Sequence, residues 1–138
     1  MPIVLECHKG IGGTVQGTAL VAKDNLSARY DLDRLQGVFS RPAHKLHGQS
    51  YVGVVLVLVT AKGGVASAWM LREMTERGMA PKAIVFDRAN TILAQGAAFA
   101  GLTLVDRFAA GDPTDLIRSG DELLIEPAVG RVTILNRG

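Results

Sequence analysis

The chain has 138 residues, of which 48% are hydrophobic and 20% charged, and its formal net charge is +2. This length and composition predict one globular domain, residues 1–138, and exclude a disordered chain. No apolar stretch approaches the roughly 20 residues of a membrane span. The basic residues form no run, so neither a membrane nor a nucleic acid is expected as a partner. The amino end, MPIVLECHKG, is too short and too charged for a secretory signal, and we therefore expect a cytoplasmic protein.

The single cysteine, Cys7, excludes an internal disulfide. It also excludes an iron–sulfur site built by this chain alone, since such a site typically needs three or four thiolates. A lone cysteine in an apolar strand is most often a buried small hydrophobe.

The amino-terminal part predicts strands at 3–8 and 18–22, separated by a glycine-rich segment at 10–17. This GIGGTVQG segment is not a dinucleotide-binding fingerprint, because Val15 occupies the place of the third glycine and no helical pattern follows. The glycines are better explained by bulges and close backbone contacts. Residues 23–53 form a long polar connection, which is either functional or contains short strands.

The central part predicts a β-α-β-α-β unit. The apolar run at 54–59 is typical of a strand covered on both faces. A helix follows from Val65, with Trp69, Met70 and Met74 spaced to share one side. A strand at 82–86, a helix at 90–100 and a strand at 102–105 complete the unit. Such an alternation predicts parallel strands joined by right-handed crossovers.

The carboxyl-terminal part predicts one helical turn at 114–118 and two strands, at 122–126 and 131–135. The segment Pro127-Ala128-Val129-Gly130 between the strands is typical of a tight turn, so the chain closes with a β-hairpin. The fold class is therefore α/β, with a central βαβαβ unit and a C-terminal β-hairpin.

The turn Ala61-Lys62-Gly63-Gly64 joins the predicted central strand to its helix and is the first candidate site. Ligands of open α/β sheets usually bind at the carboxyl ends of strands. Helix N-termini offer unpaired N–H groups to an anion. Lys62 either anchors a carboxylate or phosphate or is a solvated turn lysine. Ser67, in the first helical turn, either presents its hydroxyl to a ligand, as a base, or bonds its own backbone.

Other candidate groups are weaker. His44 and His47 lie three positions apart, but a metal site normally needs a third ligand, and loop packing or hydrogen bonding is the more economical role. No pair of aspartates has a spacing that predicts acid–base catalysis. The scattered aspartates are Asp31, Asp33, Asp106, Asp112, Asp115 and Asp121.

The order of several segments resembles the small subunit of aconitase X, the swivelling-domain partner of aconitase-like dehydratases. These segments are GTVQGTALV, LSARYDLDRLQGVFSRPAHKLHGQSYVG, VVLVLVTAKGGVASAWMLREMTERGMAPKAIVF, ILAQGAAFAGLTLVDRF and SGDELLIEPAVGRVTIL. Together they cover nearly the whole chain. The resemblance implies a swivelling β/β/α domain.

The resemblance also implies a function. Members of this family dehydrate a small hydroxy acid, such as 5-phosphomevalonate or a hydroxyproline isomer. A large subunit carries iron, often as an iron–sulfur cluster, and the small subunit docks on it and completes the active site. This chain would bind no cofactor itself. By this resemblance Gly63, Gly64 and Ser67 form the catalytic turn, with Ser67 as the base, and Lys62 and Arg29 contact the anionic substrate. Many members carry a serine at the position of Gly64, so either Ser67 substitutes for it or the protein is a divergent paralogue with other chemistry.

Two other functions stay open. One is a non-catalytic anion-binding or regulatory module with the same swivelling fold. The other is a phosphohistidine swivel domain, which would need a histidine in an exposed glycine-flanked turn; His8, His44 and His47 do not lie in one. A swivel domain encoded separately is expected to expose an apolar docking face and to self-associate when produced alone.

Overall fold

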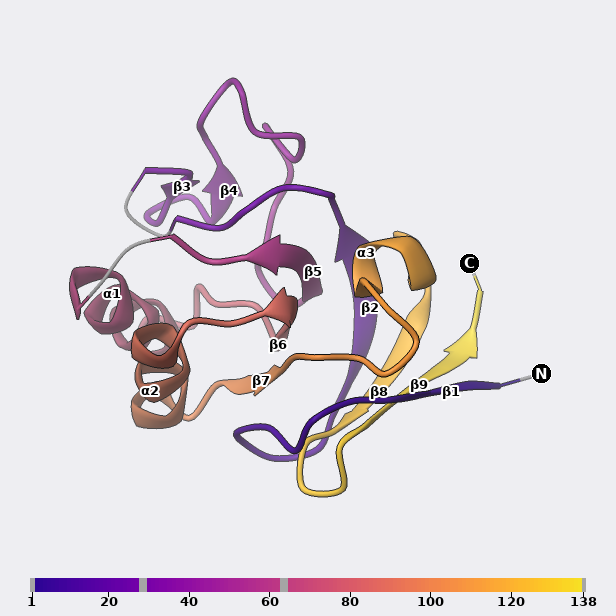
Figure 1. The fold of residues 1–138 in the computed structure, drawn as a ribbon. Helices are drawn as coiled ribbons and strands as arrows, with labels where there is room; N and C mark the ends of the chain where they lie inside the picture. Colours follow the sequence, from indigo (N-terminus) through magenta and orange to yellow (C-terminus); the bar gives the residue numbers. More distant parts are fainter. Residues whose placement is uncertain (1, 28–29, 63–64, 138) are drawn as a thin grey trace.

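The fold is described from a computed structural model, for residues 2–27, 30–62 and 65–137. Its centre is a sheet in which the strand order is β1-β9-β8-β2-β5-β6-β7. Two helices cover one end of this sheet and the C-terminal hairpin lies at the other (Figure 1). The α/β class, the central βαβαβ unit and the C-terminal hairpin are confirmed. The elements are β1 (Ile3–Glu6), β2 (Val15–Val21), β3 (Leu32–Asp33), β4 (Val38–Phe39), β5 (Val55–Thr60), α1 (Val65–Glu76), β6 (Ala83–Arg88), α2 (Thr91–Ala100), β7 (Thr103–Val105), α3 (Pro113–Leu116), β8 (Glu122–Glu126) and β9 (Arg131–Asn136).

Strand β2 joins an antiparallel half of the sheet to a parallel half. It pairs antiparallel with β8 and parallel with β5. β5, β6 and β7 continue the parallel half, and β8, β9 and β1 continue the antiparallel half. Beyond β1 the chain reaches the far edge, where Cys7 bridges to Phe108 and Ile11 to Leu104. The sheet therefore curls until the segment that follows β1 meets β7 and the residues after it.

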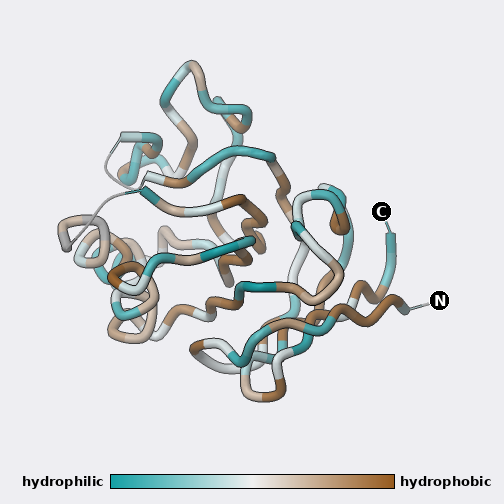
Figure 2. Tube along the Cα trace, viewed as in Figure 1, coloured by the Kyte–Doolittle hydropathy of each residue, from teal (hydrophilic) through white to brown (hydrophobic). Residues whose placement is uncertain are grey.

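The central strands are buried on both faces, as the apolar runs predict. Along β5, Leu56 and Leu58 face the core beneath α1 and α2, whereas Val55 and Val57 face a second core inside the curled sheet. β6 alternates in the same way. Figure 2 shows the hydrophobic stretches along these central strands. Because successive strand residues point to opposite faces, a continuous apolar run is needed to fill both cores.

Helices α1 and α2 pack closely at a glycine. A Cβ added at Gly96 of α2 would lie 2.5 Å from the Cβ of Ala68 in α1. One expectation for α1 is wrong: Met74 is buried, but Trp69 is 59% exposed and does not share its side. Trp69 instead stacks edge-on against Phe99 of α2, with ring centroids 5.4 Å apart. No helix among the described residues is long and apolar enough to cross a membrane.

The glycine-rich segment makes the close contacts expected of it. A Cβ at Gly10 would lie 2.2 Å from the carbonyl oxygen of Leu104, and Gly12 has a φ of +87° beside Thr103. β2 begins at Val15, three residues earlier than predicted. The connection from 23 to 53 contains β3 and β4, a two-stranded sheet of its own.

Candidate functional site

A pocket of about 330 Å³ opens where β2 and β5 end. Three segments meet there: the chain after β2, the loop after β4 and the turn after β5. The lining residues are Asp24, Asn25, Ser27, Tyr30, Asp31, Arg41 and Lys62. Because β2 and β5 are parallel neighbours, both chains leave the sheet at the same edge, which is where the sequence predicts a ligand.

Backbone hydrogen bonds hold the turn after β5 against the chain after β2. The Leu26 N–H donates to the Thr60 carbonyl over 2.9 Å, and the Lys62 N–H donates to the Leu26 carbonyl over 2.7 Å. The Asn90 side chain, which caps α2, donates to the Ala61 carbonyl over 3.3 Å. The backbone of Lys62 is thereby fixed, while its side chain is exposed at the pocket.

An ion pair between Asp31 and Arg41 forms part of the pocket wall. The Asp31 carboxylate is buried and accepts the Ser27 N–H over 2.8 Å and the Arg41 Nε–H. The Arg41 side chain is 40% exposed. Asp31 therefore holds the segment before it, at Ser27, and the loop after β4, at Arg41. Arg41 presents positive charge to the pocket.

His44 is a buried residue that contacts the pocket wall at Asn25. Its Nδ1 accepts the Leu46 N–H over 3.0 Å, which places the ring proton on Nε2, 2.7 Å from the Asn25 carbonyl oxygen. The ring is buried and stacks on Phe39 with centroids 4.6 Å apart. The hydrogen-bonding role expected of His44 is confirmed.

Asp24 is charged at the rim of the pocket. Partial burial opposes ionisation, but the N–H groups of Asn25 and Lys45 donate to the carboxylate. The pKa of Asp24 consequently lies below its ordinary value of 3.8.

The structure describes only some of the residues predicted for the site. Lys62 lines the pocket. Ser67 lies in the first turn of α1, and its side chain is outside the described part of the chain. Arg29, Gly63 and Gly64 also lie outside the described residues. Their assigned roles stay predictions.

Sequence reasoning missed most of the pocket wall. Ser27, Asp31, Tyr30 and Arg41 were not singled out for it. No local pattern joins them, since Asp31 and Arg41 are ten positions apart in an irregular connection.

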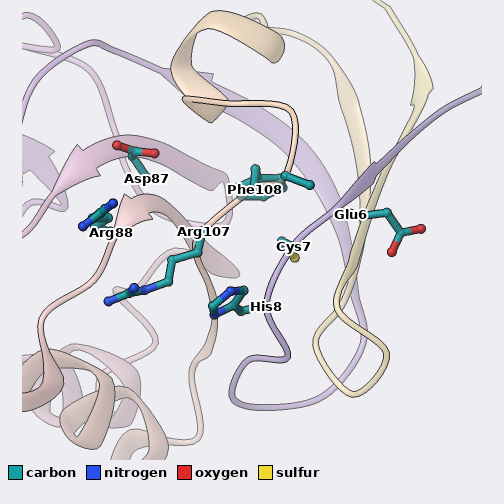
Figure 3. A pocket seen from close by; sticks show the side chains of 8 residues that line it. Glu6, Cys7, His8, Asp87, Arg88, Arg107 and Phe108 are labelled. Carbon is teal, nitrogen blue, oxygen red and sulfur yellow. The ribbon is translucent and has the colours of Figure 1, made fainter.

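A second pocket, of about 350 Å³, lies where β6 and β7 end. Figure 3 shows its side chains, among them His8, Arg88 and Arg107. Burial, together with the nearby carboxylates of Asp106 and Glu6, raises the pKa of Cys7 in this pocket to about 11. The thiol is therefore protonated at neutral pH and is a poor nucleophile or metal ligand there.

The described residues do not fit an iron site. Among them no three His, Cys, Asp or Glu side chains are grouped to hold a metal ion. Cys7 carries its proton, and both ring nitrogens of His44 have partners in the protein.

Comparison with known proteins identifies the family. The aconitase X swivel domain matches residues 4–134. The chain belongs to the aconitase X swivel domain family. A chain in the crystal structure of Thermococcus kodakaraensis aconitase X in its holo-form superimposes on this one with a TM-score of 0.89, at 27% identity. The alignment covers 97% of this chain and 99% of that one.

Two relatives have a named activity. The phosphomevalonate dehydratase small subunit of *Methanothrix thermoacetophila* is 37% identical over 103 residues, 75% of each chain. That of *Thermococcus sibiricus* is 34% identical over 130 residues, 94% of this chain and 97% of the relative. This chain therefore belongs to the family that includes the phosphomevalonate dehydratase small subunits.

Proposed function

We propose that this chain is the small subunit of a hydro-lyase that removes water from a small hydroxy acid, with 5-phosphomevalonate as the first substrate to test. The observation that carries the proposal is the pocket at the end of β5. It joins Lys62 to Ser27 and Tyr30, which lie on either side of the Arg29 segment. The names of the relatives support the reaction class.

In this proposal a large subunit covers the pocket and completes the active site. The family resemblance assigns iron to that subunit, where it would act as a Lewis acid on the leaving hydroxyl.

Lys62 and Arg41 bind the substrate in this account. Both are cationic, and both line the same pocket. Asp31 keeps Arg41 in place, so that its guanidinium meets a substrate carboxylate without first having to be ordered. Arg29 is the third cation proposed for this role.

Ser67 is the proposed base. Its oxygen removes the proton from the carbon next to the carboxylate, the electron pair of that C–H bond forms the double bond, and the hydroxyl of the neighbouring carbon leaves as water after taking up a proton. A serine oxygen needs its negative charge stabilised before it can act this way. The dipole of α1 and the unpaired N–H groups of its first turn favour negative charge at this end of the helix.

The test is turnover by the assembled complex. The Ser67→Ala variant should form the complex normally and lose at least about 1000-fold in kcat, as expected for a general base without a substitute. Ser50→Ala is the matched control, because the Ser50 hydroxyl is exposed, accepts the Val52 N–H and lies outside the pocket. Near-normal turnover of 5-phosphomevalonate by Ser67→Ala would refute the assignment of the base.

A further inference from the structure

Three cations follow the parallel strands at the same edge of the sheet. Lys62 comes two residues after β5, Arg88 is the last residue of β6, and Arg107 comes two residues after β7. Neighbouring strands are about 4.8 Å apart, so β7 ends roughly 10 Å from β5. A ligand with an anionic group at each of its ends can therefore contact Lys62 and Arg107 together.

Hydrogen bonds tie these strand ends to one another. The Thr60 hydroxyl donates to the Arg88 carbonyl over 2.6 Å, and the Arg107 N–H donates to the Asp87 carbonyl over 3.0 Å. The ends of β5, β6 and β7 are thus connected to one another.

Arg107 has an unusual backbone. Its φ is +59°, and no other residue of the described chain except glycine has a positive φ. Its carbonyl accepts the His8 N–H over 3.2 Å, so contacts with the chain after β1 maintain this conformation. Strained residues of this kind cluster at ligand-binding sites.

The second pocket has two cations, Arg88 and Arg107, that an anion can contact. Glu6 and Asp87 also line it, but in Figure 3 their carboxylates point away from Arg107 and His8. Arg107 is 49% exposed, with its Nε 3.6 Å from an Asp106 carboxylate oxygen. The Arg88 guanidinium has no ion pair within the described part of the chain and is exposed.

We propose that this second pocket binds a phosphate group of the substrate, with Arg88 and Arg107 as its ligands. Guanidinium groups match phosphate oxygens in pairs of parallel hydrogen bonds, and His8 adds a further donor. The inference rests on the proposed function for the identity of the substrate, but the phosphate site itself is a property of this chain alone. The carboxylate end of the same molecule would lie in the pocket of Lys62.

Titration with inorganic phosphate tests the site without any activity. In the isolated ¹⁵N-labelled chain, phosphate should shift the amide signals of residues 7–8, 88 and 107–109. The double variant Arg88→Met, Arg107→Met should raise the Kd at least about tenfold, as expected for loss of charged hydrogen bonds. Arg118→Met is the matched control, since Arg118 is exposed and lines neither pocket. No shifts in the millimolar range, or shifts unchanged in the double variant, would overturn the proposal.

The assembled complex supplies a second readout. Arg88→Met should raise the KM for 5-phosphomevalonate at least about tenfold and leave the KM for unphosphorylated mevalonate unchanged. An unchanged KM for the phosphorylated substrate in both single arginine variants would contradict the site. If the complex turns over neither substrate, the proposed function fails, and the phosphate titration alone decides whether this pocket is an anion site.

Discussion

Asp31 and Arg41 form an ion pair in which the carboxylate is buried and the guanidinium is 40% exposed. Asp31 also accepts the Ser27 N–H, and the N–H groups of Ser40 and Arg41 donate to its backbone carbonyl. One residue thus connects both sides of the pocket wall.

Replacing Asp31 by Asn should therefore destabilise the protein. The amide keeps an acceptor for Ser27 but loses the charge that pairs with Arg41, and we expect the free energy of unfolding to fall by about 1–3 kcal/mol. Urea denaturation measures this. Asp115→Asn removes the exposed pair between Asp115 and Lys23, 2.9 Å apart, and should change stability by less than about 1 kcal/mol. Equal stabilities of the two variants would contradict the structural role of Asp31.

The contact between Gly96 and Ala68 predicts a second effect on stability. Gly96→Ala puts a methyl group 2.5 Å from the Ala68 Cβ, so α1 and α2 must separate, and we expect a loss of about 1–3 kcal/mol. Gly13→Ala is the control, because a Cβ there meets nothing within 4 Å and the substitution should be neutral or slightly stabilising. Thermal unfolding of both variants provides the comparison, and a Gly96→Ala protein as stable as Gly13→Ala would show that the helices are not in contact there.

Cys7 predicts a pH dependence. Its pKa is raised from the ordinary value of 9.0 to about 11, chiefly by burial. Between these two values the unfolded chain has lost the thiol proton while the native chain keeps it, so the unfolded state binds fewer protons and this group lowers stability as pH rises from 9 to 11. The Cys7→Ser variant should lack that part of the decrease.

The same pKa predicts slow alkylation of Cys7. At pH 8 the native thiolate fraction should be about 100-fold below that of an unperturbed thiol, with a matching decrease in the rate of reaction with iodoacetamide. Unfolding in urea should restore the ordinary rate. A native rate equal to the unfolded one would show that the thiol is not buried beside carboxylates.

Trp69 and Phe99 predict self-association of the isolated chain. Each is 59% exposed, and with Ile92 they border an apolar groove of about 220 Å³ between α1 and α2. Exposed apolar surface of this kind favours association in water. Sedimentation velocity should show a concentration-dependent dimer that the double variant Trp69→Ser, Phe99→Ser abolishes. Leu35→Ser is the control, since Leu35 is 76% exposed but lies outside this groove. A monomer at all concentrations would contradict the prediction.

Much of the fold follows from the sequence because its signals are local. The runs at 54–59 and 82–86 fill two cores, and Asn90 and Gly101 cap α2, so periodicity and cap residues fix these elements. β2 extends further than predicted because Gly17 leaves room for neighbours: a Cβ there would lie 3.1 Å from Val55. That contact is long-range, and a pattern along the chain does not contain it.

The site was less predictable than the fold. Lys62 is recognisable from its position after a buried strand, whereas Arg41 lines the pocket through a long-range ion pair with Asp31. Trp69 has the helical spacing of a core residue, yet its side of α1 carries the exposed groove. Periodicity finds an apolar face but does not tell a buried core from an exposed groove.

The most direct test of the proposed function is an anaerobic affinity purification of this chain from an extract of the organism that encodes it. The eluate is then analysed by mass spectrometry, for its iron content and for dehydration of 5-phosphomevalonate. We predict a stoichiometric, cysteine-bearing partner, bound iron and dehydratase activity. A chain that elutes alone, without iron and without activity, would contradict the proposed function and favour a non-catalytic anion-binding module.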